Sequence, residues 1–215
     1  MARGPLIVFE GVEGVGKSTQ LRRLTAWMES GGRVVHALRE PGGTPLGDEI
    51  RRLLLHPDSD ITPRAEALLF MASRAQLVET LVRPALEAGH VVVLDRFFLS
   101  TYAYQGAGRG LPEAEVRRAN AVATSGLVPD LTLLLTLPVA EGLARAAQRG
   151  ARDRMERNAD EFHHRVSDAF ASFAGAAWQA EHPECGPIVT VDASGSEDEV
   201  FARVRAVLGD RFAIR

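Results

Sequence analysis

Short apolar runs alternate with longer amphipathic segments along the whole chain. The apolar runs have the length of β-strands and lie at residues 6–9, 33–38, 90–94, 131–137 and 188–191. Segments with helical periodicity separate them, which is typical of successive strand–helix–strand units. The uninterrupted run from Val91 to Leu94 indicates a strand that is buried on both faces of a parallel sheet. We therefore predict an α/β fold in one domain, residues 1–215, with a five-stranded parallel sheet wrapped by helices.

Glycines, prolines and changes of periodicity place the helices. The first predicted helix ends near Glu29, ahead of Gly31 and Gly32. The others are expected at about residues 47–55, 63–87, 112–125, 138–149, 159–181 and 196–208. Residues 150–157 are mostly charged and carry almost no apolar side chain. We expect a short mobile lid at about residues 149–157.

Composition excludes some classes of protein. With 46% hydrophobic and 25% charged residues, the chain resembles an ordinary globular protein. A formal net charge of −3 does not favour a general nucleic-acid binder, and no apolar run approaches the roughly 20 residues of a membrane span. Cys185 is the single cysteine, and the N-terminus lacks the apolar core of a signal peptide. We predict a cytoplasmic protein that binds neither nucleic acid nor a membrane.

The strongest motif follows the first strand. It is the sequence Gly11-Val12-Glu13-Gly14-Val15-Gly16-Lys17-Ser18, a phosphate-binding loop between a predicted strand and a predicted helix. Glycines let backbone N–H groups point at phosphate oxygens, at the positive end of the following helix. Lys17 is expected to reach the β- and γ-phosphates of ATP, and Ser18 to ligate Mg²⁺. Thr19 either contacts the α-phosphate or is a plain helix residue.

Two carboxylates accompany this loop. Glu13 lies inside it, where a negative charge is unfavourable unless it is offset, so Glu13 is expected to face Mg²⁺, a nearby arginine or a hydroxyl of the second substrate. A side chain that points to solvent is the alternative. Asp95 and Arg96 follow the buried third strand, at the edge of the sheet where ligands bind in α/β folds. Asp95 is expected to hold Mg²⁺ and Arg96 to bind the phosphate of an acceptor. The alternative for the pair is a salt bridge at the end of a strand.

Further segments resemble the bacterial type of the thymidylate kinase family over nearly the whole chain. The resemblance is carried by Phe9-Glu10-Gly11-Val12-Glu13-Gly14, Arg39-Glu40-Pro41-Gly42-Gly43-Thr44, Phe70-Met71-Ala72-Ser73-Arg74, Asp95-Arg96, Tyr104-Gln105-Gly106 and Asp153-Arg154-Met155-Glu156. It implies a P-loop nucleoside monophosphate kinase fold, with Mg²⁺, ATP and dTMP bound and a homodimer formed. Phe97 departs from the Tyr or His that often follows Asp-Arg in the family, and so removes one polar group.

The resemblance also implies where the acceptor binds. Phe70 and Arg74 share one helix face, so a ring can stack on thymine and a guanidinium can donate to its O4. Core packing is the alternative for Phe70. Thr101 and Gln105 are expected near the base, and Tyr104 near the 2′ position of the sugar. Arg39 lies on the acceptor side, with a less defined role than Arg96.

The predicted lid carries Arg149, Arg152, Arg154 and Arg157. A closing segment can bring an arginine to the phosphoryl group, where it stabilises negative charge and excludes water. The resemblance places the catalytic arginine in this lid, with Arg154 first and Arg149 second by motif match. A solvated basic loop is the alternative.

Together these features predict an enzyme that converts ATP and dTMP to ADP and dTDP. Lys17, Arg96 and the lid arginines are its expected catalytic residues. One alternative is a kinase for another nucleoside monophosphate. A second is a nucleotide-dependent switch, but the chain lacks the Asn-Lys-x-Asp motif that reads guanine.

Overall fold

The sheet has five parallel strands in the order β2-β3-β1-β4-β5. We describe a computed structural model that covers residues 3–138, 141–142, 145, 153–156, 158–209 and 212. The strands are β1 Leu6–Glu10, β2 Val35–Arg39, β3 Val91–Asp95, β4 Leu131–Thr136 and β5 Ile188–Asp192. This arrangement confirms the predicted fold class, and each predicted strand agrees to within about two residues.

The register brings charged side chains to one edge of the sheet. Phe9 and Arg39 both pair with Asp95, and Glu10 pairs with Leu134. Because all strands are parallel, their carboxyl ends lie together at this edge. The last residues of β1, β2 and β3 are therefore neighbours before any loop is considered.

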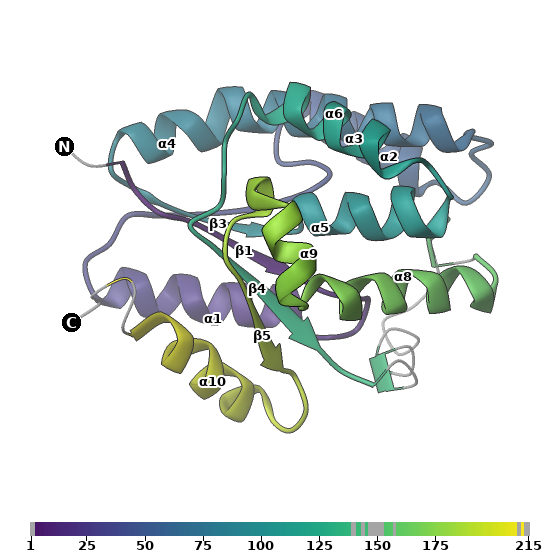
Figure 1. Cartoon of the computed structure of the whole chain (residues 1–215). Helices are drawn as coiled ribbons and strands as arrows, with labels where there is room; N and C mark the ends of the chain where they lie inside the picture. Colours follow the sequence, from purple (N-terminus) through teal and green to yellow (C-terminus); the bar gives the residue numbers. More distant parts are fainter. Residues whose placement is uncertain are drawn as a thin grey trace.

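Helices cover both faces of the sheet (Figure 1). On one face lie α1 Lys17–Ser30 and α10 Glu197–Gly209, which pack on each other. On the other face lie α2 Pro45–Leu55, α3 Pro63–Leu77, α4 Arg83–Glu87, α5 Phe98–Thr101, α6 Glu113–Thr124 and α8 Asp160–Phe173. Alternate residues of β1 enter two apolar cores: Ile7 and Phe9 pack toward α1, and Leu6 and Val8 toward the opposite layer.

The structure differs from the predicted helices in three places. The segment predicted at 63–87 is helical throughout, but a π-helix, η1 Val78–Val82, joins α3 to α4. The single helix predicted at 159–181 is wrong. It ends at Phe173, because Gly175 takes an extended backbone (φ −69°, ψ 136°), and α9 Ala176–Glu181 follows. A second π-helix, η2 Tyr102–Gly108, continues α5, and no helix was predicted for these residues.

The predicted helix at 138–149 and most of the predicted lid lie outside the described residues. Of these segments the structure describes residues 141–142, 145 and 153–156. Within the described part of the chain, no helix is both long enough and apolar enough to cross a membrane.

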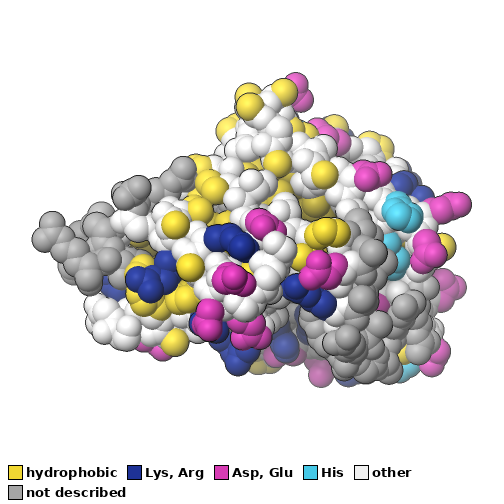
Figure 2. Space-filling model, turned by 90° about the horizontal axis from the view of Figure 1, so that it is seen from below, with side chains coloured by type: hydrophobic (Ala, Val, Ile, Leu, Met, Phe, Trp, Pro, Cys, Tyr) yellow, Lys and Arg dark blue, Asp and Glu magenta, His cyan; other side chains and the backbone are white. Residues whose placement is uncertain are grey.

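The face that carries α10 has mixed charge. Arg23 pairs with Glu197 and Asp198, and Arg203 pairs with Asp192. Figure 2 views the molecule from this side and shows positive and negative side chains interspersed. Charges on this face are therefore neutralised by near neighbours.

The strand core can be tested with two valines. Val93 in β3 has no exposed surface, whereas Val34 is 55% exposed. We expect Val93→Ala to lower the free energy of unfolding by about 2 kcal/mol, because two buried methyl groups are lost. Val34→Ala should change it by less than about 0.5 kcal/mol. Denaturant unfolding of both variants measures the difference, and equal effects would contradict the assignment of β3 as a buried strand.

Candidate active site

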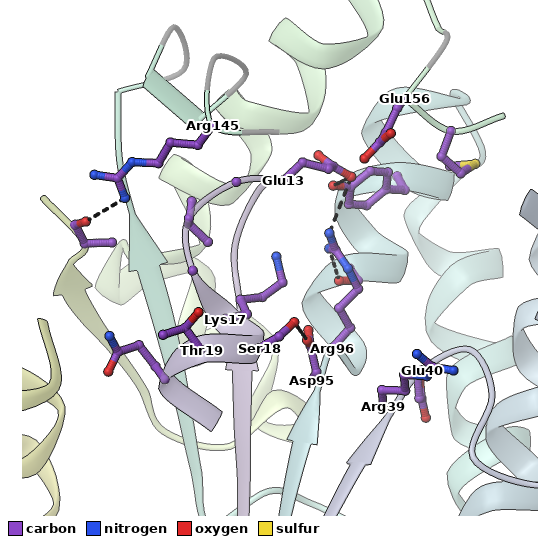
Figure 3. A pocket seen from close by; sticks show the side chains of 18 of the residues that line it. Glu13, Lys17, Ser18, Thr19, Arg39, Glu40, Asp95, Arg96, Arg145 and Glu156 are labelled. Carbon is purple, nitrogen blue, oxygen red and sulfur yellow. Dashed lines mark hydrogen bonds and ion pairs between the residues drawn. The ribbon is translucent and has the colours of Figure 1, made fainter. Parts of the chain in front are cut away.

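A cavity of about 740 Å³ lies at the carboxyl edge of the sheet. It is lined by fifteen of the predicted site residues: Glu13, Gly14, Val15, Gly16, Lys17, Ser18, Thr19, Arg39, Phe70, Arg74, Asp95, Arg96, Thr101, Tyr104 and Gln105. Figure 3 shows Lys17, at the end of the phosphate loop (residues 11–18), on one side and Arg39, at the end of β2, on the other. Gly11, Val12 and Arg154 are described but do not line the cavity, and Arg149 lies outside the described residues.

The phosphate loop needs a glycine at position 14, where its backbone approaches the backbone of Gly142. Gly14 has φ +79°, and a Cβ there would lie 1.9 Å from the carbonyl oxygen of Gly142. Any side chain at this position would collide with backbone. The loop then leads into α1, whose first residue is Lys17. The positive end of α1 therefore faces the cavity.

Lys17 is buried inside the curve of this loop (Figure 3). Its Nζ donates to the carbonyl oxygens of Gly11 and Val12, each at 2.8 Å. Burial lowers the pKa of Lys17 to about 8, and the positive charge of Arg96 contributes to the shift. An anion bound at the loop would favour the charged ammonium.

Ser18 and Asp95 form the pair expected of a Mg²⁺ site. Ser18 Oγ donates to Asp95 Oδ2 at 2.8 Å (Figure 3). Mg²⁺ prefers oxygen ligands and is commonly held by one or two protein oxygens together with phosphates. Among the described residues, no group of three or more His, Cys, Asp or Glu side chains could hold a metal. Ser18 and Asp95 supply two oxygens, which fit a Mg²⁺ ion that phosphates also bind.

Glu13 has the cation that its position requires. Its Oε1 lies 3.4 Å from the Arg96 guanidinium and accepts a hydrogen bond from the Tyr104 hydroxyl at 2.5 Å. Burial alone would raise the pKa of Glu13, but Arg96 and Lys17 outweigh it and hold that pKa below its ordinary value. Glu13 therefore orients Arg96 and Tyr104 toward each other.

Arg96 is held in a strained backbone by a residue that sequence reasoning missed. Its φ is +74°, an uncommon value for a residue with a side chain. Glu10, fully buried at the end of β1, accepts hydrogen bonds from the N–H groups of Phe97 (2.7 Å) and Ser100 (3.0 Å) and from Ser100 Oγ (2.6 Å). These bonds fix the start of α5 and so compensate for the strain at Arg96.

Arg74 is a buried residue in the cavity wall where the base is predicted to bind. Its guanidinium donates to the Glu40 carboxylate, Thr101 Oγ1 (2.9 Å), Asn120 Oδ1 and the carbonyl oxygen of Phe97 (2.8 Å). Glu40 Oε2 accepts from Nε at 2.7 Å and also lies 2.6 Å from Nη2 as an ion pair, so each of the three guanidinium nitrogens has a hydrogen-bond acceptor within the protein. Arg74 thus fixes Thr101 in the wall of the cavity. A direct contact with a base would have to share a bond already made.

Phe97, the departure from the family pattern, lies in the core rather than in the cavity. Its ring is fully buried, and the Arg74 guanidinium carbon lies 4.9 Å from the ring centroid. The aromatic ring supports Arg74 through a cation–π contact. Phe70, by contrast, is half-buried and lines the cavity.

Arg154 occupies a place that motif matching did not predict. Its side chain donates to the carbonyl oxygen of Leu54 at 2.7 Å and to Glu66 Oε2 at 2.6 Å. The guanidinium is thus bound to Leu54 and Glu66 and does not line the cavity. Its neighbours Asp153 and Met155 line the cavity instead.

The comparisons with known proteins agree with this geometry. A family model described as "Thymidylate kinase" matches residues 9–204. The chain belongs to the thymidylate kinase family. It is 46% identical over 211 residues to a thymidylate kinase of Deinococcus radiodurans, covering 98% of this chain and 99% of the relative. A thymidylate kinase of Thermosynechococcus vestitus is 50% identical over 182 residues, covering 80% and 76%. The crystal structure of the thymidylate kinase from Ehrlichia chaffeensis matches with a TM-score of 0.74 at 26% identity, covering 96% and 99%.

Several cavity residues of this family member escaped the sequence analysis. They are Arg51, Ser100, Arg145 and the segment after β5 that includes Ala193, Gly195, Ser196 and Glu197, whereas Glu40, Asp153 and Met155 were part of quoted motifs but had no role assigned. The segment after β5 had a usable signal, because it follows a strand at the ligand edge. Arg145 had none: it lies in the helical segment ahead of the lid and reaches the carbonyl oxygen of Ala193 at 3.4 Å (Figure 3).

The low pKa of Lys17 leads to a pH prediction for ATP binding. The charged ammonium binds phosphate, so the affinity for ATP should fall as the pH rises through about 8. From about pH 7 to about pH 9 we expect a loss of about tenfold in affinity. Titration calorimetry with ATP measures it. Lys17→Met, which has no charge to lose, should bind weakly with little change across the same range. An equal pH dependence in both proteins would show that another group titrates.

Proposed function

We propose that the protein transfers the γ-phosphate of ATP to dTMP and so forms ADP and dTDP, a step toward dTTP. One observation carries this function: in a member of the thymidylate kinase family, a single cavity joins the phosphate loop to Arg96 and to the predicted base-binding residues. Donor and acceptor phosphates can therefore meet within it. Holding two reactants in line supplies much of the catalysis in phosphoryl transfer.

On the donor side, the backbone of the phosphate loop and Lys17 bind the ATP phosphates. Thr19 lies in the first turn of α1 and is proposed to contact the α-phosphate. Ser18 and Asp95 would hold Mg²⁺, which neutralises charge on the β- and γ-phosphates. Arg145 and the segment after β5 line the remaining donor side, where the nucleoside of ATP would lie.

On the acceptor side, Arg96 binds the phosphate of dTMP and directs its oxygen at the γ-phosphate. Arg39 and Arg51 also line this part of the cavity. Burial lowers the pKa of Arg51, and the charge of Arg39 lowers it further, which indicates a concentration of positive charge. Such a field attracts the dianionic acceptor. No general base is needed, because a monophosphate oxygen is already anionic at neutral pH.

The base and sugar of dTMP are proposed to lie beyond Arg96. Phe70 stacks on thymine, Thr101 and Gln105 face its edge, and Tyr104 occupies the space that a ribose 2′-hydroxyl would need. The hydrogen bond from Tyr104 to Glu13 supports its placement next to the sugar phosphate. Arg74 supports this wall and is proposed to reach O4 by sharing one of its bonds.

A lid arginine is proposed to stabilise the charge of the transferred phosphoryl group. Arg149 and Arg154 are the predicted residues. Arg154 is bound to Glu66 at 2.6 Å, so for this residue direct action on the phosphoryl group and action through Glu66 are alternatives. The kinetics of Arg154→Ala and Glu66→Gln distinguish them.

The acceptor is tested by ADP release from ATP and Mg²⁺ with dTMP, dUMP, dCMP, dGMP, dAMP and UMP. We expect dTMP to turn over fastest. For dUMP, which lacks one methyl group, kcat/KM should be about 10–200-fold lower. The remaining acceptors should give little turnover, and Lys17→Met should abolish it. Faster turnover of another monophosphate would replace dTMP as the acceptor, and no acceptor-dependent turnover would overturn the kinase.

We also propose a homodimer through the helix layer of α2, α3 and α6. These helices are neighbours, and they expose large apolar side chains: Leu46 and Leu53 on α2, Leu68 on α3 and Val122 on α6. Val122 is 83% exposed and Leu68 65%. Exposed apolar groups gathered on adjacent helices are typical of a protein–protein interface. We place this dimer in the cytoplasm, where ATP and nucleotide precursors are available.

The dimer is tested by sedimentation of the wild-type chain and of Leu68→Asp. A charge on α3 at the interface should convert a wild-type dimer to monomer, because a buried unpaired carboxylate is costly. Val34→Asp alters an exposed apolar residue outside these helices and should leave the dimer intact. A monomeric wild-type chain, or a dimer in the Leu68 variant, would contradict the proposal.

A further inference from the structure

Glu66 is a fully buried carboxylate that the phosphate chemistry does not use. It lies in the first turn of α3, with 0% of its side chain exposed. Oε1 accepts hydrogen bonds from Gln105 Nε2 (3.0 Å) and Arg109 Nε (3.1 Å). Oε2 accepts from Arg109 (3.0 Å) and Arg154 (2.6 Å). We call Glu66, Gln105, Arg109 and Arg154 the Glu66 cluster.

The Glu66 cluster is held by charge as well as by geometry. Burial alone would raise the pKa of Glu66, but hydrogen bonds from Arg109 and Gln105 and the charge of Arg109 hold it below its ordinary value. The carboxylate thus stays ionised between two guanidinium groups. Hydrogen bonds between charged groups are stronger than those between neutral groups. Without them, the buried carboxylate would be an unpaired charge and would destabilise the folded protein.

The partners of Glu66 belong to two walls of the active-site cavity. Gln105, on η2, lines the cavity on the acceptor side. Because its amide nitrogen is bound to a carboxylate, which only accepts hydrogen bonds, the amide has one orientation and its oxygen remains for the cavity. Arg154 belongs to the turn 153–156, whose other members Asp153, Met155 and Glu156 line the cavity.

Two independent paths connect Glu66 to this turn. The first is direct, through Arg154, whose Nε and backbone N–H also donate to the carbonyl oxygens of Leu54 (2.7 Å) and Leu55 (3.2 Å) at the end of α2. The second passes through Arg109, which donates to Asn158 Oδ1 at 2.7 Å. Asn158 Nδ2 in turn donates to the carbonyl oxygen of Met155 at 2.7 Å.

We propose that Glu66 is a positioning residue for the phosphoryl transfer, which fixes the turn 153–156 and Gln105 as one unit around the acceptor. Arg154 then acts through Glu66: its guanidinium is bound to Glu66 and does not line the cavity, while its neighbours Asp153, Met155 and Glu156 do. This role rests on the proposed function for its kinetic consequence, but the attachment itself can be measured without substrate.

The attachment is tested by hydrogen exchange on the full chain without ligands. In Glu66→Gln, an amide NH₂ must face an arginine donor in either orientation, so the cluster loses bonds. We expect amides of residues 153–158 to exchange at least about tenfold faster than in the wild type, with β1 unchanged. Glu79→Gln is the matched control, because Glu79 is 57% exposed and pairs with Arg83 on the surface. Unchanged exchange at 153–158 in the Glu66 variant would overturn the attachment.

Kinetics then test the positioning role. We expect Glu66→Gln to lower kcat/KM for dTMP by about 10–100-fold, with KM for ATP changed less than about twofold. Arg154→Ala should lose a similar factor, and the double variant should be no worse than Arg154→Ala alone, since both changes break one unit. A melting temperature within a few degrees of wild type excludes global unfolding. Arg154→Lys provides a milder variant, with an intermediate loss expected, if Glu66→Gln does not fold.

Two results would overturn the positioning role. One is wild-type kinetics in Glu66→Gln. The other is a large loss of kcat in Arg154→Ala that Glu66→Gln does not share, because Arg154 would then act on the phosphoryl group itself. A wild-type enzyme without dTMP-dependent turnover would overturn the proposed function instead, and hydrogen exchange would still decide whether Glu66 holds the turn.

Discussion

The carboxylate of Glu10 connects the two halves of the active site. It stands at the last position of β1, directly before the phosphate loop, and it binds the first turn after β3 through three hydrogen bonds. The loop proposed to bind ATP and the arginine proposed to bind the acceptor are thus attached to one buried group. This connection is possible only because β1 and β3 are parallel neighbours in register, with Phe9 opposite Asp95. The sheet order therefore determines how far the phosphate loop after β1 lies from Arg96 after β3.

The charges around this connection are arranged to receive anions. Lys17, Arg39, Arg51 and Arg96 line the cavity, and Glu13 and Asp95 offset part of their charge. Burial disfavours the charged form of Lys17, and bound phosphates would restore it. Before an acceptor binds, Glu13 pairs with Arg96, so Arg96 is not an unpaired buried cation. The Glu13–Arg96 pair thus serves both the binding of an anionic substrate and the stability of the fold before the substrate binds.

Local sequence signals predicted the parts of this structure that depend on near neighbours. Apolar runs located the five strands, and the spacing of glycines and Lys17 located the phosphate loop. Glu10, Glu66 and Arg145 carry no such signal, because each acquires its role from a partner far along the chain: Glu10 from Phe97 and Ser100, Glu66 from Arg109 and Arg154. The break at Gly175 and the π-helix at Val78–Val82 were missed for a related reason, since both continue an amphipathic pattern that tertiary packing interrupts.

Arg74 has partners within the protein that its motif did not predict. Its spacing from Phe70 predicted two side chains that face one ligand, yet only Phe70 lies free on the cavity wall. The guanidinium of Arg74 joins Glu40, Thr101, Asn120 and the backbone of Phe97, and it rests on the Phe97 ring. This arrangement also explains why the chain tolerates phenylalanine at position 97. The ring is fully buried, so a hydroxyl added there would need a buried partner of its own. The aromatic face, which phenylalanine provides equally well, is the part that the arginine uses.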